Sequence, residues 1–142
     1  MSYYLTFTNA NEQIHIAAEW LIYVSSDGNY SDIHLLNGER HTLSQQLGTI
    51  EALIINQLQY NKQDNEDIDK TLLPVIRLLQ IHKPKFVRIG KSLIVNLHYV
   101  HYINPNKKQL ILTDCQTFKT TLDASKDALK KLKDYLEKQS KE

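Results

Sequence analysis

The sequence predicts a mostly β domain with flanking helices, an α+β fold in which short strands follow one another as a meander. Eight tyrosines and many isoleucines, valines and threonines favour strands. Short alternating or apolar runs recur along the chain, and turn-forming pairs such as Asn37-Gly38 separate them. Other stretches repeat their apolar residues with the spacing of a helix. These three observations together indicate strands packed against a few helices.

The length and composition are those of one cytoplasmic domain. The chain has 142 residues and a hydrophobic fraction of 42%, so we expect a single domain over residues 1–142 with its core between about 14 and 136. No run approaches the roughly 18 apolar residues that cross a bilayer, and the N-terminus lacks the pattern of a secretory signal. The single cysteine, Cys115, cannot form an internal disulfide and fits a reducing cytoplasm.

The first strands are expected between residues 14 and 43. Asp27-Gly28 and Asn37-Gly38 lie between apolar segments, which is a strong signal for hairpin turns. Alternation of apolar and polar residues, or a short apolar run, marks each strand. The expected strands are residues 14–16, 20–24, 30–36 and 39–43.

Three helices are expected. The first is opened by Ser44 as its N-cap and carries an apolar stripe. Residues 56–69 are so polar that we expect a mobile loop. Residues 70–82 are helical again, with Pro74 in the first turn, and residues 124–138 form the last helix. The stripe of the first helix consists of Leu43, Leu47, Ile50, Leu53 and Ile54.

The central stretch, residues 86–97, combines apolar residues with a cationic corner. Gly90 lets the backbone turn where a side chain would clash, so we expect Lys91 and Ser92 at an exposed corner between buried flanks. Arg88 adds a second cation beside it. A short cationic corner on a rigid strand can present a side chain to a phosphate or a base edge. Further strands are expected at residues 99–103, 109–113 and 117–122.

The charge is distributed unevenly along the chain. The net charge of +1 is the sum of −6 up to Ile81 and +7 from His82 onward. Such asymmetry indicates a charged partner, for example nucleic acid. The alternative is that the lysines at the C-terminal end only solvate the last helix.

Metal binding and catalysis find little support. His98 and His101 are three residues apart, a spacing that on a strand would place them on opposite faces. His34 and His41 lie across a hairpin, but no cysteine or clustered carboxylates join them. The acidic run at residues 64–69 lacks the central glycine of a calcium loop, and no serine elbow or glycine-rich phosphate loop is present. We expect no enzymatic activity, no metal and no cofactor.

Residues 86–97 closely resemble the signature of the LytTR family of bacterial DNA-binding domains, roughly Phe-x-Arg-Ile/Cys-His-x-Ser-x-x-Val-Asn. Gly90 stands where the family usually has histidine. Residues 20–30 resemble a second family segment, and the likeness covers most of residues 14–136. The matching signature residues are Phe86, Arg88, Ser92, Val95 and Asn96.

The resemblance implies a bacterial transcriptional regulator that binds duplex DNA as a dimer or on repeated half-sites. In the family, three loops reach the DNA instead of an inserted recognition helix; here they correspond to the regions around Tyr30, Lys91-Ser92 and residues 122–126. Lys91 would contact a base edge, since lysine donates to guanine O6 and N7, while Ser92 and Lys126 would hold phosphates. The expected DNA-binding residues are Asn29, Tyr30, Arg88, Lys91, Ser92, Lys119 and Lys126.

Three departures from the family leave a rival interpretation open. Asp123 stands where the family typically has an arginine. A carboxylate there loses a guanine contact and repels phosphate; at best it accepts from a cytosine amino group, or it caps the helix. The connection at residues 56–85 is unusually long, and its helix at 70–82 would be buried on the domain, a second copy or a partner protein. A chain of 142 residues has no room for the usual receiver domain, so we expect a standalone module. The rival is a LytTR-fold protein–protein interaction module that has lost DNA binding.

Overall fold

The computed structural model describes residues 3–64 and 84–140 and is organised around a five-stranded antiparallel sheet. The strand order is β5-β4-β3-β7-β6, so strands from both halves of the chain meet at β3 and β7. Neither helix in the described part of the chain is both long and apolar enough to cross a membrane. The strands of this sheet are β3 (Leu21–Ser26), β4 (Ser31–Leu35), β5 (Arg40–Leu43), β6 (Phe86–Ile89) and β7 (Leu93–Asn96).

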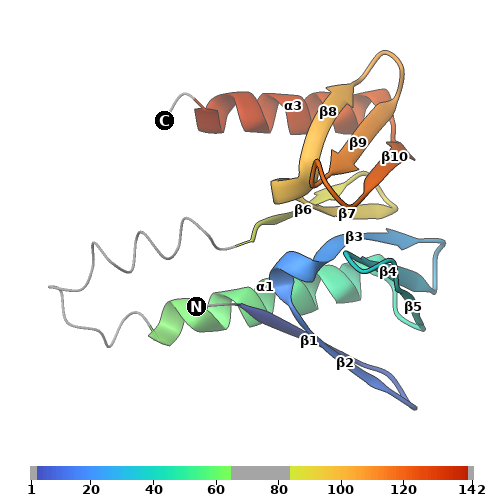
Figure 1. Cartoon of the computed structure of the whole chain (residues 1–142), viewed down its shortest axis with the longest axis vertical. Coiled ribbons are helices and arrows are strands. Elements are labelled where there is room, and N and C mark those ends of the chain that lie inside the picture. Colours follow the sequence, from blue (N-terminus) through green and yellow to red (C-terminus); the bar gives the residue numbers. More distant parts are fainter. Residues whose placement is uncertain (1–2, 65–83, 141–142) are drawn as a thin grey trace, which may run out of the picture.

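Two further layers cover the faces of this sheet (Figure 1). A hairpin of β1 (Tyr4–Thr8) and β2 (Gln13–Ala17) lies on one side with helix α1 (Leu47–Asp64). The opposite side holds a three-stranded sheet and helix α3 (Lys126–Ser140). The strands of this smaller sheet are β8 (Val100–Asn104), β9 (Gln109–Thr113) and β10 (Lys119–Asp123), and the short 3-10 turns are Ala18–Trp20 and Leu97–Tyr99.

Strand β7 contributes to the hydrophobic core on both of its faces. Ile94 packs in the cluster on the α1 side, whereas Leu93 and Val95 pack in the cluster on the α3 side. This division follows from the alternation of side chains along a strand. Because both faces of β7 are buried, this strand holds the β6–β7 hairpin in a fixed position.

The mostly β prediction is confirmed, and so are the expected hairpin turns. Gly28, Gly38 and Gly90 all lie in turns between paired strands and have φ values of +104°, +90° and +65°. A left-handed backbone costs a residue with a Cβ about 1–2 kcal/mol, which explains glycine at these corners. Cys115 is exposed in the β9–β10 turn.

The N-terminal segment differs from the prediction. Strand β1 was not expected, yet Leu5 and Phe7 are fully buried in the α1-side cluster. Trp20 was expected in a buried strand, but it lies in a 3-10 turn and its side chain is 44% exposed. Leu5 and Phe7 alternate with Thr6 and Thr8, and this short run forms a strand by pairing with β2.

The boundaries of the first helix were also predicted wrongly. Helix α1 begins at Leu47, and the Gln46 carbonyl accepts the first backbone hydrogen bonds, so Ser44 is not the N-cap. The expected polar loop from position 56 is wrong up to Asp64, because α1 continues through it. The rest of that loop and the expected helix at residues 70–82 lie outside the described residues.

His34 makes the stability of the fold depend on pH. Its ring stacks on Tyr23 at 4.0 Å, and Nε2 lies 2.9 Å from the Ser25 hydroxyl. Burial lowers the pKa of His34 below its ordinary value, an effect that Asp32 opposes and Arg40 reinforces. The folded chain therefore favours the neutral ring, whereas the unfolded chain takes up a proton near pH 6.5.

We expect stability to be complete above about pH 6.5 and to decline as the pH falls from there through the folded pKa. Urea unfolding at pH 7.5 and 5.5 measures this decline, and His34→Gln should reduce it. His101→Gln, at an exposed histidine, is the control and should leave the decline unchanged. Equal declines in the wild type and His34→Gln would contradict the assignment.

Candidate nucleic-acid interface

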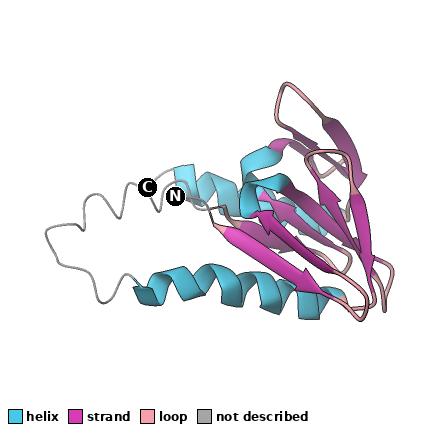
Figure 2. Cartoon of the chain, turned by 60° about the horizontal axis from the view of Figure 1, so that its bottom comes forward, coloured by secondary structure: helices cyan, strands magenta, loops and turns pink. Residues whose placement is uncertain are grey.

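Three loops and the start of α1 gather at one end of the molecule, on the right in Figure 1. The loops are the β3–β4 turn, the β6–β7 turn and the β10–α3 junction; Figure 2 shows α1 beginning beside the loops at this end. The Ser26 amide donates to the Ser92 carbonyl over 2.9 Å, which joins the first two loops. A Cβ at Gly90 would lie 3.8 Å from the Cβ of Ala128, in the first turn of α3. The three regions expected to reach DNA therefore form one surface.

An open hollow of about 420 Å³ lies where the first two loops meet the start of α1. It contains Asn29, Arg88 and Lys91, so the fold brings together three of the expected site residues. Two of them are cationic. The hollow is lined by Ser26, Gly28, Asn29, Gln46, Leu47, Gly48, Arg88 and Lys91.

Lys91 is the exposed cation of this hollow. It directly follows Gly90 in the turn, and its neighbours in the two strands, Ile89 and Leu93, are buried. Among the residues that the structure describes, no carboxylate forms an ion pair with Lys91. The backbone is thus held while the ammonium group remains available to a ligand, which confirms the exposed corner predicted from the sequence.

Arg88 faces α1 from strand β6. Its Nη1 lies 3.4 Å from Oε1 of Glu51, and the two side chains are 35% and 33% exposed. A Cβ added at Gly48 would be 3.7 Å from the same Nη1. A larger residue at position 48 would therefore reduce the space in which the Arg88 guanidinium approaches the first turns of α1.

The β3–β4 turn presents a polar and an aromatic side chain. Gln46 donates from Nε2 to Oδ1 of Asn29 over 3.3 Å, linking this turn to the residue before α1. The Tyr30 carbonyl accepts from the Asp27 amide and the Ser26 hydroxyl, each over 3.1 Å. The backbone of Tyr30 closes the turn, and its side chain is 53% exposed.

The β10–α3 junction carries Lys126 and two carboxylates, Asp123 and Asp127. Ser125 caps α3 by accepting from the Ala128 amide over 3.2 Å, and Lys126 is exposed in the first turn. The Ala124 amide donates to the Lys108 carbonyl over 3.2 Å, so the β8–β9 turn lies beside the junction. Asp123 is exposed there.

Lys119 lies apart from the junction. It begins strand β10, whose last residue is Asp123. A strand of this length separates the two Cα atoms by about 13 Å. Lys119 is exposed but does not line the hollow.

Sequence reasoning missed several residues of this end of the molecule. Gln46 and Gly48 line the hollow, and Glu51 neutralises Arg88 although 37 positions separate the two. Lys108 was not among the expected DNA-binding residues, yet its turn contacts the junction. Finding Lys108 would have required the register of β9 with β10, and no sequence pattern connects Glu51 with Arg88.

The signature residues divide into structural and exposed ones. Asn96 is fully buried; its Nδ2 donates to the Leu21 carbonyl and its Oδ1 accepts from the His98 amide, both over 3.0 Å. Val95 is also fully buried, and Phe86 packs against the cluster on the α1 side. The signature therefore mainly preserves the hairpin that carries the exposed corner.

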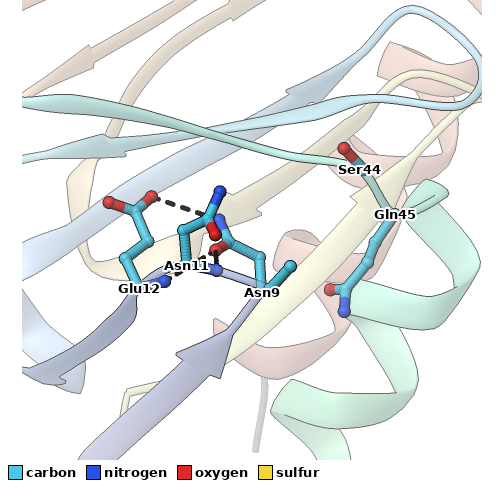
Figure 3. A pocket seen from close by; sticks show the side chains of 6 residues that line it. Asn9, Asn11, Glu12, Ser44 and Gln45 are labelled. Carbon is cyan, nitrogen blue, oxygen red and sulfur yellow. Dashed lines mark hydrogen bonds between the residues drawn. The ribbon is translucent and has the colours of Figure 1, made fainter.

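A second hollow, of about 510 Å³, lies between the β1–β2 turn and the connection from β5 to α1 (Figure 3). Asn9 uses its side chain to close the turn, accepting from the amides of Asn11 and Glu12. The lining contains one carboxylate and no lysine or arginine, so it is unsuited to phosphate. Its residues are Asn9, Ala10, Asn11, Glu12, Ser44 and Gln45. Within the described residues, no group of three histidine, cysteine or acidic side chains is placed to hold a metal ion.

Comparison with known proteins identifies the domain. Residues 68–137 match the model of the LytTr DNA-binding domain family. This segment is similar to the LytTR family. The range that matches the LytTR model includes the Gly90 corner, the smaller sheet and most of α3.

The similarity of fold extends beyond the matched range. A LytTr DNA-binding domain from Bacillus cereus has a similar structure, with a TM-score of 0.54 and 14% identity. The likeness covers 96% of this chain and 98% of that one. A comparison with curated proteins finds no match. The resemblance noted in the sequence is confirmed.

Proposed function

We propose that this LytTR domain binds duplex DNA through its three-loop end and acts as a transcriptional regulator. The observation that carries the proposal is the exposed, unneutralised Lys91 on a turn between buried strands. Beside it lie Asn29 and Arg88, in a hollow without a carboxylate in its lining. The chain then works as one unit spanning residues 1–142, and binding requires no catalysis.

The expected contacts follow from the positions of the side chains. Lys91 reaches a base edge, because lysine donates to the guanine acceptors in the major groove. Ser92 and Lys126 hold backbone phosphates on either side of it, and Tyr30 adds contact area. Lys119 supplies a more distant phosphate contact on a longer duplex. Phosphate contacts orient the protein, whereas base contacts select the sequence.

The proposal predicts salt-dependent binding to duplex DNA. Each phosphate neutralised by a lysine or arginine steepens the plot of log K against log salt by about 0.9. We therefore expect binding to a random pool of duplexes at low salt that weakens steeply as salt is added. Fluorescence anisotropy measures the slope, and selection from the same pool identifies the preferred site. No binding at low salt would contradict the proposal.

One observation favours the rival function, a protein–protein interaction module. Asp123 is exposed at the junction, and Glu51 neutralises Arg88, so part of the cationic surface is offset. Under this alternative, the chain shows no DNA binding at low salt but is retained by a protein partner. The same titration separates the two functions.

A further inference from the structure

The contact between Arg88 and Glu51 is weak in geometry and sits at the edge of the proposed DNA surface. One guanidinium nitrogen approaches one carboxylate oxygen at 3.4 Å, and about one third of each side chain is exposed. Arginine binds carboxylate or phosphate most strongly through two parallel hydrogen bonds at shorter distances. This pair lacks that arrangement, and exposed ion pairs contribute little to stability.

The surroundings favour an exchange of partners. Arg88 also lines the hollow that contains Lys91, so its guanidinium borders both α1 and the open surface. Glu51 does not line the hollow, and the lining residues contain no other charge besides the two cations. A phosphate entering the hollow would meet Lys91 and could offer Arg88 two oxygens in place of one.

We propose that Glu51 is a built-in competitor for DNA phosphate. It holds Arg88 in the free protein, and Arg88 exchanges the carboxylate for a backbone phosphate when DNA binds. This inference rests on the proposed function and assigns a further residue to it. Glu51 does not contact DNA itself. It lowers the affinity for DNA by pairing with Arg88, so binding is limited to duplexes that also contact the other DNA-binding residues of the three-loop end.

The test is Glu51→Gln, which removes the charge and keeps the shape of the side chain. We expect this variant to bind duplex DNA at low salt roughly 3- to 10-fold more tightly than the wild type, because one competing charge contact with Arg88 is lost. In an Arg88→Ala background the gain should disappear, because there is no arginine to release. Glu39→Gln is the matched control: it removes the same charge in the β4–β5 turn, at the other end of β4 from Tyr30.

A second probe separates this inference from the proposed function. Inorganic pyrophosphate is titrated while the NMR signal of the Arg88 side chain is followed, and it should respond at lower concentration in Glu51→Gln than in the wild type. If DNA binds and Glu51→Gln gains nothing or weakens binding, the competitor role is wrong and the function stands. If DNA does not bind but the Arg88 response appears, the proposed function fails and the competition with DNA fails with it, although Glu51 still controls access of phosphate to Arg88. Absence of both responses overturns both.

Discussion

Asn96→Ala is expected to lower the free energy of unfolding by about 2–4 kcal/mol, because it leaves two backbone groups without partners. The carbonyl of Leu21 loses its donor in the core, and the amide of His98 loses its acceptor. Leaving a buried polar group unsatisfied costs about 1–3 kcal/mol each. Asn96 connects β7 to the beginning of β3 and to the 3-10 turn that leads into β8, so the loss affects both sheets.

Urea unfolding followed by circular dichroism measures this change. Asn106→Ala, at an exposed position of the β8–β9 turn, is the matched control and should change stability by less than about 0.5 kcal/mol. Equal effects at the two positions would show that the buried hydrogen bonds of Asn96 contribute nothing beyond the ordinary cost of a substitution.

Lys91→Ala is expected to weaken binding to the selected duplex by about 1–3 kcal/mol and to relax the preference at one base position. The physical reason is the loss of a donor at a base edge, which no neighbouring side chain replaces on the same turn. Stability should not change, since Lys91 is exposed and forms no ion pair with a described residue. Anisotropy titrations on the selected duplex and on single-base variants measure both effects.

Lys138→Ala, at an exposed lysine near the end of α3 remote from the three loops, is the control for net charge. It should weaken binding much less than Lys91→Ala. A uniform loss across all duplexes in Lys91→Ala would show that this lysine contacts only phosphate. In that case the specificity would have to come from another loop, with Tyr30 as the next residue to substitute.

Much of the fold could be predicted because local rules were sufficient. The turns at Gly28, Gly38 and Gly90 follow from residues that adopt a left-handed backbone, and the alternation in β4 follows from burial of one face. The last helix was expected at residues 124–138, close to the observed bounds of α3. Strand β1 was missed because its two buried residues gain their apolar surroundings only from α1 and β2.

The candidate site was predicted in part. The exposed corner at Lys91 follows from one glycine between apolar strands, and that is visible in the sequence. The grouping of Asn29, Arg88 and Lys91 in one hollow required the pairing of β3 with β7, and of β6 with β7. The neutralisation of Arg88 by Glu51 required α1 to lie across the face of β6 that carries the arginine.

The amino-acid sequence by itself determined the class of fold, the positions of the hairpin turns and the presence of a LytTR signature. These depend on backbone preferences and on periodic burial, which act over a few residues. Only the tertiary structure decided which cations share a surface and which is neutralised. Electrostatic contacts act through space, so their partners depend on how distant segments pack, and Glu51 with Arg88 is the clearest case.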